Sequence, residues 1–336
     1  MPKYVIMQNP GHNRVYFSLS AKLAKNELAA LFGTSIENIE EEVFGGVEYI
    51  TFESKIALSD MDIILLSRLS FVYAIFEAHG NMFLPVQKNH SYFFSDDLNM
   101  ILKYSGKTNE IFTRMMINLA VFASDFKPDC LENLNLLDPI CGKGTTVFDG
   151  LICGYNSYGI DISEKLINES VQFFKKYLEN GKYKHSHKKE RFSGQGFKSN
   201  RYFFEAAKNK SDQKSDKNLS CEFISGDSIN VNKYYKKKFF HIIAGDLPYG
   251  VQHDNSAFGN KMRNPRDLIE ACIPSWLEVL KSGGGIAIAW NTFLLKREQI
   301  AQTFEKNGLE IIDFGDFTHR VDQAIMRDVI VARKKG

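Results

Sequence analysis

The chain lacks long hydrophobic stretches. Its 336 residues include no run of about 18 apolar residues, which is the length that a membrane-spanning helix requires. The first residues, Met1-Pro2-Lys3-Tyr4, also lack the pattern of a secretory signal peptide. We therefore expect neither membrane insertion nor export, and the cytoplasm is the expected location.

Cysteine is scarce, and its spacing is uninformative for disulfides. The five cysteines form no C-x-x-C pair, and no histidines cluster near them. They are Cys130, Cys141, Cys153, Cys221 and Cys272. An odd, widely spaced set of this kind predicts neither a disulfide framework nor a structural zinc site. No bound metal is expected, and no internal repeat is visible.

A strong overall charge is absent as well. The chain carries 42 Lys and Arg against 40 Asp and Glu, a formal net charge of +2. This balance gives no global positive field of the kind that marks many nucleic-acid-binding proteins. The distribution is uneven, however, because residues 175–217 hold thirteen Lys or Arg against five Asp or Glu.

The basic stretch interrupts the alternating strand and helix pattern between the expected second and third strands of a sheet. Its cations are interleaved with aromatic residues such as Tyr183, Phe192 and Tyr202. Such a mixture can neutralise phosphates and stack on unpaired bases. The candidate nucleic-acid contacts are Lys182, Lys184, Lys188, Lys189 and Arg191. A solvated, partly disordered surface insertion explains the composition equally well.

The most informative segment is Asp138-Pro-Ile-Cys-Gly-Lys-Gly-Thr-Thr146, which follows an apolar strand and leads into an apolar helix. A Walker loop would need Ser or Thr after Lys143, where this chain has Gly144. A dinucleotide-binding loop would need a third glycine at the position of Val147. The segment therefore predicts a nucleotide-cofactor loop of another type.

A second acid follows at a suitable distance. Asp161 ends a short strand 17 residues after Gly144, where a carboxylate can accept hydrogen bonds from a ribose diol. A helix-capping role beside Ser163 is the alternative. Within the loop, Cys141 is more readily interpreted as a small, tightly packed side chain than as a nucleophile.

About a hundred residues later, Asp246-Leu247-Pro248-Tyr249-Gly250 follows the buried strand Phe239 to Ala244. An acid and an aromatic residue at this place would project over the edge of an open sheet. Together with the cofactor loop, they predict group transfer to a planar amine. A turn without catalytic meaning is the alternative for these residues taken alone.

These motifs resemble those of class I S-adenosylmethionine-dependent methyltransferases. The loop resembles the Asp-Pro-x-Cys-Gly-x-Gly-Thr form of RNA and DNA amino-methyltransferases, and residues 246–249 resemble their (Asn/Asp)-Pro-Pro-Tyr motif. The helix containing Arg114 to Ala120 makes the chain most similar to the THUMP-associated tRNA guanosine-N2 methyltransferases. The resemblance covers roughly residues 105 to 335.

The resemblance implies S-adenosyl-L-methionine as cofactor and assigns site residues. The cofactor-binding set is Asp138, Pro139, Cys141, Gly142, Gly144, Thr145, Asp161, Ile162, Asp227 and Ser228. Asp227 would accept a hydrogen bond from the adenine amino group. In the catalytic motif, the Asp246 carboxylate and the Leu247 carbonyl would hold the target amine. Pro248 would fix the turn, and Tyr249 would stack on the base.

The implied function is methylation of an exocyclic base amine in RNA, with N2 of a tRNA guanosine as the leading target. One alternative is a DNA adenine or cytosine amino-methyltransferase, which would flip its base out of a duplex. Another is a non-catalytic RNA-binding protein that retains the fold, because Leu247 replaces the usual proline. His253, Asp254 and Asn255 are expected over the target base.

Residues 1–88 predict a small α+β ferredoxin-like domain, because their pattern reads βαββαβ. The expected elements are a strand at 3–8, a helix at 21–31, strands at 39–44 and 47–52, a helix at 61–69 and a strand at 71–76. The resembled tRNA enzymes join such a domain to a THUMP module, and this segment is too short to hold both. A linker is expected at residues 89–105.

Residues 106–336 predict an α/β, Rossmann-like, seven-stranded methyltransferase sheet with a basic insertion at about 180–218. Strands alternate with helices, which favours parallel pairing for most of the sheet. The expected third to fifth strands are 221–224, 239–244 and 286–290. Residues 309–314 and 324–332 are expected to close the sheet as an antiparallel hairpin.

Overall fold

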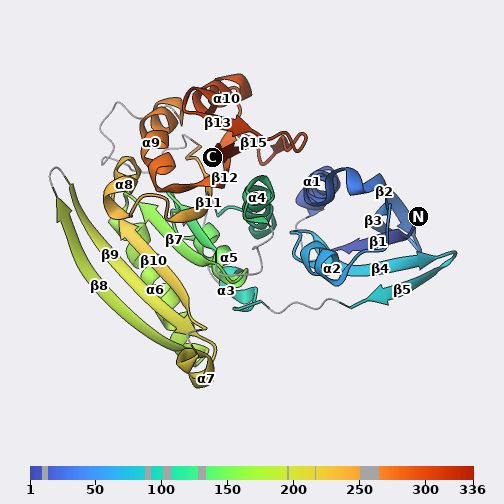
Figure 1. Cartoon of the computed structure of the whole chain (residues 1–336), viewed down its shortest axis with the longest axis horizontal. Helices are drawn as coiled ribbons and strands as arrows, with labels where there is room; N and C mark the ends of the chain where they lie inside the picture. Colours follow the sequence, from blue (N-terminus) through green and yellow to red (C-terminus); the bar gives the residue numbers. More distant parts are fainter. Residues whose placement is uncertain are drawn as a thin grey trace. The chain divides into compact units, whose positions relative to one another are not determined.

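The computed structural model describes residues 1–9, 14–87, 92–100, 107–127, 134–194, 197–215, 217–249 and 265–336. Cys130, Gly250 and the expected loop residues His253, Asp254 and Asn255 lie outside these ranges. The chain divides into two compact units, drawn in Figure 1. The first comprises residues 1–91 and 313–319, and the second comprises 92–312 and 320–336. No helix in the described ranges is long and apolar enough to cross a membrane.

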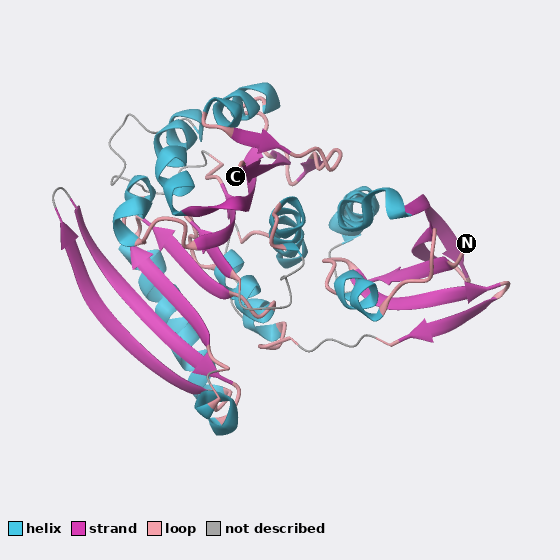
Figure 2. Ribbon diagram, in the orientation of Figure 1, coloured by secondary structure: helices cyan, strands magenta, loops and turns pink. Residues whose placement is uncertain are grey.

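The first unit is a five-stranded antiparallel sheet in the order β2-β3-β1-β4-β5 with two helices. Its elements are β1 (Lys3–Gln8), α1 (Arg14–Phe32), the 3-10 helix η1 (Gly33–Ser35), β2 (Ile36–Phe44), β3 (Val47–Ser54), α2 (Asp60–Ser67), β4 (Val72–His79) and β5 (Met82–Val86). With η1 set aside, the first six elements have the predicted ferredoxin-like order, and β5 is an additional edge strand. Figure 2 shows α1 and α2 beside this sheet.

Alternation along the strands separates the two faces of this sheet. Ile6, Ile50 and Phe52 are fully buried on the face that packs against the helices. The other face holds an aromatic group in which the Phe44 and Phe83 rings are 4.8 Å apart. Since these residues come from the two edge strands, the sheet must curl strongly across this face.

The second unit contains the remaining elements of the chain. They are α3 (Asp97–Met100), α4 (Glu110–Ala123), β6 (Asn135–Asp138), α5 (Thr145–Ile152), β7 (Asn156–Asp161), α6 (Glu164–Asn180), β8 (Lys184–Gly194), β9 (Phe197–Ala207), α7 (Lys210–Lys214), β10 (Leu219–Ser225), η3 (Ser228–Asn230), α8 (Val231–Tyr234), β11 (Phe240–Asp246), α9 (Pro265–Val279), β12 (Leu280–Asn291), α10 (Arg297–Lys306), β13 (Leu309–Ile311), β14 (His319–Arg320) and β15 (Met326–Lys334).

The sheet of this unit contains the seven expected strands in the order β10-β7-β6-β11-β12-β15-β13. The first five pair in parallel, whereas β15 is antiparallel to both β12 and β13. The strand order reverses between β6 and β11. In open α/β sheets, ligands bind at such a switch point, outside the carboxyl ends of the strands. The predicted cofactor loop follows β6, and the predicted catalytic motif begins at the end of β11.

The basic insertion is a correction to the sequence-based expectation. It does not interrupt the sheet but extends it, because β9 pairs with β10 and β8 pairs with β9, all antiparallel. Tyr202 and Phe204 of β9 are buried, so these aromatic rings belong to the core and not to a base-stacking surface. The Phe204 ring packs 5.2 Å from that of Phe174 in α6. The hydrophobic face of α6 requires this cover, which explains why the segment forms strands.

The expected linker is also shorter in the structure. Residues 92–100, which fall within the predicted linker, belong to the second unit. Phe94 and Leu98 are buried there. Arg114 of α4 holds the segment by donating to Asp149 at 2.8 and 2.6 Å and to the Tyr92 hydroxyl at 2.9 Å. Desolvation lowers the pKa of this buried guanidinium, but the neighbouring Asp149 carboxylate raises it, and the net pKa lies above the ordinary value.

Candidate active site

The cofactor loop joins β6 to α5 through two glycines in the left-handed region. Gly142 has φ +53° and Gly144 has φ +83°. A Cβ on Gly144 would lie 2.9 Å from the Phe223 ring, so this glycine permits close packing inside the fold. A Cβ on Gly142 would meet nothing within 4 Å. The backbone at Gly142 therefore borders open space at the carboxyl edge, where a cofactor can approach it closely.

Asp161, at the end of β7, faces this loop. One carboxylate oxygen accepts a hydrogen bond from the Gly142 N–H at 2.9 Å, and the other accepts from the Ser163 N–H at 2.8 Å. The position of Asp161 is therefore compatible with both roles considered for it. It can bind a ribose, and it can cap the start of α6. Burial raises the pKa of Asp161 above its usual value, although these two N–H groups oppose the shift.

Asp138, the last residue of β6, is almost fully buried. Desolvation raises its pKa to about 7, and the nearby carboxylates of Asp161 and Asp246 contribute in the same direction. Its Oδ1 accepts from the Ile140 N–H at 3.1 Å, which shapes the turn after Pro139. Two acids predicted from other parts of the sequence therefore act on Asp138 at the same edge of the sheet.

Cys141 is packed inside the loop. Its thiol is buried, and burial raises its pKa well above the ordinary value, so the reactive thiolate is disfavoured. The Cys141 N–H donates to the Ile160 carbonyl at 2.8 Å, and its carbonyl accepts from the Gly144 N–H at 2.7 Å. A packing role fits this geometry better than that of a nucleophile.

The remaining predicted cofactor residues line the neighbouring strand ends. Pro139 and Thr145 are buried, whereas Ile162 and Asp227 are half-buried. Asp227 follows β10 and accepts from the Ile229 N–H at 3.0 Å. The Ser228 hydroxyl accepts from the buried Trp276 indole at 2.9 Å, so its side chain serves the core.

The acceptor predicted from the catalytic motif is surrounded by polar groups. Asp246 receives a hydrogen bond from the Thr108 hydroxyl at 2.9 Å, and the Tyr249 hydroxyl donates to the same carboxylate. A nitrogen of Arg327 lies 3.7 Å from Asp246, whose side chain is 13% exposed. The Tyr249 ring therefore turns back onto the acid in this structure, and stacking on a base would require it to rotate away.

The sequence motifs do not identify Arg327 as a residue of the site. It is buried at the start of β15, and its guanidinium carbon lies 4.6 Å from the Phe112 ring centre and 5.1 Å from that of Tyr249. Its register partner is Asn291 at the end of β12, two strands away from the end of β6. A single basic residue so far along the chain from Asp246 carries no local signal of this role. Thr108 was missed for the same reason.

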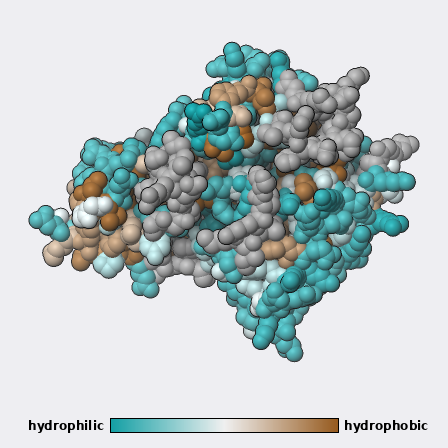
Figure 3. All heavy atoms as spheres, turned by 180° about the vertical axis from the view of Figure 1, so that it is seen from behind, coloured by the Kyte–Doolittle hydropathy of each residue, from teal (hydrophilic) through white to brown (hydrophobic). Residues whose placement is uncertain are grey.

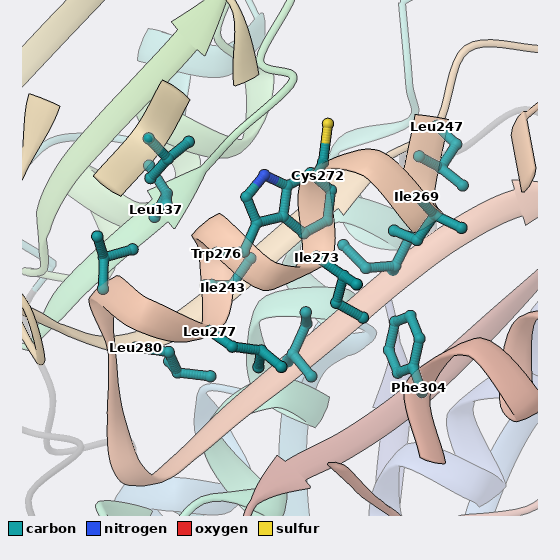
Figure 4. Packing of buried hydrophobic residues seen from close by; sticks show 14 of the residues in the cluster. Leu137, Ile243, Leu247, Ile269, Cys272, Ile273, Trp276, Leu277, Leu280 and Phe304 are labelled. Carbon is teal, nitrogen blue, oxygen red and sulfur yellow. The ribbon is translucent and has the colours of Figure 1, made fainter. Parts of the chain in front are cut away.

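Leu247 has a clear structural role in place of the usual proline. Its N–H donates to the Ala289 carbonyl at 2.9 Å, a bond that proline cannot make. Its side chain is buried against α9 (Figure 4), close to Ile269. A hydrogen bond and hydrophobic burial thus restrain the backbone where proline would restrain it by its ring. Pro248 is exposed and carries the chain from β11 toward Tyr249.

Register brings the two motifs together. Ile242 and Ile243 of β11 pair with Leu136 and Leu137 of β6, so Asp246 lies only a short way beyond Asp138 along the sheet edge. The turn glycines, the acid that ends β7 and the acid that ends β11 fit a cofactor with a ribose and an extended polar end. Within the described ranges, no group of three or more His, Cys, Asp or Glu side chains is arranged to hold a metal.

The five predicted nucleic-acid contacts do not form a single surface. Lys184 and Lys188 lie on one face of β8, and Lys189 and Arg191 lie on the other. Lys182 precedes the strand in a left-handed turn with φ +55°. All five side chains are exposed.

Comparisons with known proteins agree with this geometry. The family model described as "RMKL-like, methyltransferase domain" (UPF0020) matches residues 121–310, which is more than half of the chain. No curated protein matches at a significant level.

Solved structures with detectable similarity are distant. TehB from Haemophilus influenzae is 14% identical with a TM-score of 0.34, over 60% of this chain and 58% of that chain. This chain therefore spans less than two thirds of TehB. An rRNA methylase from Streptococcus thermophilus is 14% identical (TM-score 0.35; 66% and 96% covered). Magnesium protoporphyrin IX methyltransferase from Synechocystis PCC 6803, with bound S-adenosylmethionine, is 15% identical (TM-score 0.38; 71% and 90% covered).

The family match adds to evidence already given by the molecule itself. The strand order, the glycine loop with its two flanking acids and the Asp-Leu-Pro-Tyr motif all occupy one sheet edge. The chain belongs to the UPF0020 family, and it is an S-adenosylmethionine-dependent methyltransferase with a class I fold.

Proposed function

We propose that this methyltransferase modifies an exocyclic amine of a base in RNA, with N2 of a tRNA guanosine as the leading target. The observation that carries the proposal is the position of Asp246 at the end of β11, next to the cofactor loop at the switch point of the sheet. The sequence of residues 246–249 resembles the motif of enzymes that methylate base amines. The family match supports the same class of substrate.

The residues of the motif suit the charge changes of the reaction. The cofactor supplies an electrophilic methyl group on a sulfonium. The lone pair of the amine forms the new N–C bond while the S–C bond breaks, and an N–H proton is subsequently lost to solvent. The nitrogen becomes positive as this bond forms. The Asp246 carboxylate and the Leu247 carbonyl would accept its N–H groups, orient the lone pair and stabilise the developing charge.

Tyr249 and Arg327 both contact the Asp246 carboxylate, and they therefore affect how it can bind an amine. Tyr249 donates to Asp246 and would have to release it before the carboxylate can accept from an amine. Arg327, whose guanidinium contacts both the Phe112 and the Tyr249 rings, keeps a positive charge 3.7 Å from the carboxylate. The two oxygens of this carboxylate are the atoms that can accept hydrogen bonds from an amine.

Charge distribution supports a nucleic-acid substrate. The second unit carries 35 Lys and Arg against 28 Asp and Glu, whereas the first carries 7 against 12. The unit that contains the site is therefore the positive one. RNA is favoured over duplex DNA by the resemblance to tRNA enzymes. A DNA amino-methyltransferase would use the same acceptor chemistry after base flipping.

Nucleoside mass spectrometry of a deletion strain tests the proposal. Separate tRNA, rRNA and DNA fractions from deletion and parental strains should differ by one N-methylated nucleoside, which is expected in the tRNA fraction. The purified protein with S-adenosylmethionine should restore it, and the Asp246→Ala variant should not. Loss of a methylated nucleoside from DNA alone would overturn the RNA assignment. An unchanged nucleoside profile in all three fractions would contradict the proposed function as a whole.

A further inference from the structure

We propose that one end of the β8–β9 hairpin is a phosphate-binding surface that guides RNA to the active site, a proposal that rests on the proposed function. We call this surface the hairpin tip and define it by Lys189, Arg191 and Lys198. The rest of the basic stretch, including Lys184 and Lys188, is excluded from it. Three features distinguish the hairpin tip from the rest of the basic stretch. They are the register of the strands, the sheet face on which each side chain lies, and the contacts that hold the hairpin in place.

Register places the hairpin tip at the catalytic edge of the sheet. Asn200 of β9 pairs with Ser225, the last residue of β10, and Arg191 pairs with Asn200. Residues beyond this level therefore extend past the carboxyl ends of the parallel strands, where the cofactor loop lies. Lys184 pairs with Ala207 at the opposite end of the hairpin. At about 3.3 Å per residue, Lys184 lies about 23 Å from Arg191 along β8. Figure 1 shows the hairpin running along the whole edge of the sheet.

The side chains of the three cations lie on the same face of the sheet. Residues paired directly across two strands share a face, and Lys189 is paired with Tyr202, whose buried ring belongs to the core beneath α6. Arg191 is two residues further along, and Lys198 pairs with Ser193 on that same face. Diagonal neighbours in such a pair of strands are about 7–8 Å apart. This spacing is close to the separation of adjacent phosphates along a nucleic-acid strand.

The three cations are available to a ligand. All are exposed, and the Lys189 ammonium lies over the Tyr202 ring at 4.9 Å. In the described part of the chain, no carboxylate forms an ion pair with any of the three, whereas Lys188 is paired with Glu190. The neighbouring Glu164, at the start of α6, accepts from Asn200 at 2.8 Å. The hairpin tip thus presents unneutralised charge beside the start of α6.

The hairpin tip is held in place by its other face. Ser199 and Arg201 donate to the hydroxyl and the carbonyl of Tyr234 at 3.2 and 2.7 Å. The Arg201 guanidinium also lies 5.0 Å from the ring centre of Phe192. Tyr234 ends α8, which follows Asp227 and η3. The hairpin is therefore anchored to the segment that follows the predicted adenine site, and the three cations are positioned relative to the active site.

Charge reversal tests this proposal with a matched control. The tip variant is Lys189→Glu, Arg191→Glu and Lys198→Glu, and the control variant is Lys182→Glu, Lys184→Glu and Lys188→Glu. Both change the net charge equally. Affinity for tRNA isolated from the deletion strain is measured at several KCl concentrations on the full chain. The tip variant should bind more than about tenfold more weakly, and its salt slope should fall by about two to three, one counterion release for each lost contact.

The control variant should change the slope by less than about one. Both variants should keep the parental melting temperature and affinity for S-adenosylmethionine. If the tip variant misfolds, the neutral Lys189→Gln, Arg191→Gln and Lys198→Gln variant replaces it.

The two proposals fail in different ways. An effect of the control variant equal to or greater than that of the tip variant would overturn the role of the hairpin tip, as would parental tRNA affinity in the tip variant. In these cases the parental protein still methylates RNA, and the proposed function stands. If the parental protein neither binds nor methylates the tRNA, rRNA or total RNA of the deletion strain, the proposed function itself fails, and the hairpin proposal with it.

Discussion

Three carboxylates from three strand ends lie at the carboxyl edge of the second unit. Asp138 ends β6, Asp161 ends β7 and Asp246 ends β11, and the last two raise the pKa of the first. Gathering negative charge in this way is costly without a compensating cation. Arg327 partly supplies one, and the sulfonium of the cofactor would supply another. Single substitutions can separate these roles.

Asp246→Ala should strongly reduce turnover and leave cofactor binding intact. The carboxylate is assigned to the target amine, and removal of one positioned acceptor typically lowers kcat by about 100- to 1,000-fold. Calorimetry with S-adenosylmethionine and a methylation assay on RNA from the deletion strain measure the two effects. Thr108→Val is a useful comparison, because it removes one hydrogen bond to Asp246 but keeps the acid. A parental methylation rate in Asp246→Ala would exclude the catalytic assignment.

Replacements at Tyr249 should separate its hydroxyl from its ring. Tyr249→Phe removes the bond to Asp246 but keeps the ring, so methylation should remain within about threefold of the parental rate. Tyr249→Ala removes the stacking surface, which is worth about 1–3 kcal/mol for a base, and should raise KM or lower kcat/KM by roughly 5- to 150-fold. Steady-state kinetics on the RNA substrate measures both. If the two variants lose activity equally, the hydroxyl rather than the ring is the functional group.

Asp138 should make the protein less stable as the pH rises toward about 7. Burial raises its folded-state pKa from an ordinary value of about 3.9 to about 7, so between these values the folded state holds a proton that the unfolded state has lost. The free energy of unfolding should therefore decrease from about pH 4 toward about pH 7 and stay low above it. Because a tenfold change in a protonation equilibrium corresponds to about 1.4 kcal/mol, an effect of this size is large enough to measure.

Urea unfolding at about pH 5 and about pH 8 measures this dependence. Asp138→Asn should show a smaller difference between the two pH values than the parental protein. An identical pH dependence in the two proteins would mean that Asp138 is ionised in the fold throughout this range.

At the scale of elements, the glycines of the β6–α5 turn have different functions. Gly144 caps α5 in a left-handed conformation against Phe223, and Gly142 borders open space. A side chain at Gly144 would therefore disturb the packing of the fold before it could obstruct a cofactor. A side chain at Gly142 would project into this open space, where the cofactor is predicted to bind.

Gly144→Val should lower stability, and Gly142→Ala should lower cofactor affinity. The first change strains φ and collides with the Phe223 ring, so the free energy of unfolding should fall by more than about 2 kcal/mol. The second should cost about 1–2 kcal/mol from strain alone. Its affinity for S-adenosylmethionine should nevertheless fall at least about tenfold, because the new methyl group occupies the space of the cofactor. Thermal unfolding and calorimetry distinguish the two. Parental cofactor affinity in a folded Gly142→Ala protein would place the cofactor elsewhere.

The β8–β9 hairpin is also a structural element. Tyr202, Phe204 and Ala206 are buried in the core beneath α6, and β9 covers the edge of β10. Deleting residues 182–216 would expose this core and an unpaired strand edge, which favours aggregation. Point changes on the exposed positions therefore test RNA binding, whereas a deletion tests folding.

At the scale of the whole molecule, the two units differ in charge. The first is negative, and its exposed acidic residues include Glu37, Glu40 and Glu48 of β2 and β3. Apolar side chains such as Met82 and Leu84 are also exposed on this unit, at 65% and 50%. Brown atoms gather at the left of Figure 3, on the N-terminal unit. These features do not favour phosphate contacts.

Neutralising these three glutamates should leave the salt slope of RNA binding unchanged. The slope counts cations that displace counterions from phosphates, and glutamates contribute none. Glu37→Gln, Glu40→Gln and Glu48→Gln together should raise affinity at low salt by no more than a few fold, through reduced repulsion. Filter binding at several KCl concentrations measures this. A slope that falls by about one or more would show that this unit makes phosphate contacts of its own.

The sequence by itself determined the elements that depend on local pattern, and it predicted the chemistry at their ends. The boundaries of β1 and the ferredoxin-like order follow from alternation and turn residues, and the loop at Gly142 and the acids at Asp161 and Asp246 follow from motifs placed at strand ends. A resemblance to a family then supplied the cofactor. These features are readable because each is encoded within a few consecutive residues.

Only the tertiary structure decided the rest. The composition of the basic stretch is compatible with both a disordered loop and a binding surface. It forms strands because the hydrophobic face of α6 is buried against β9. Arg327 and Thr108 reach Asp246 because the chain folds back over the same edge from distant positions. The division of the basic residues between two faces follows from strand register. Contacts between residues far apart in the chain leave no local pattern, because they are selected by packing and not by neighbouring residues.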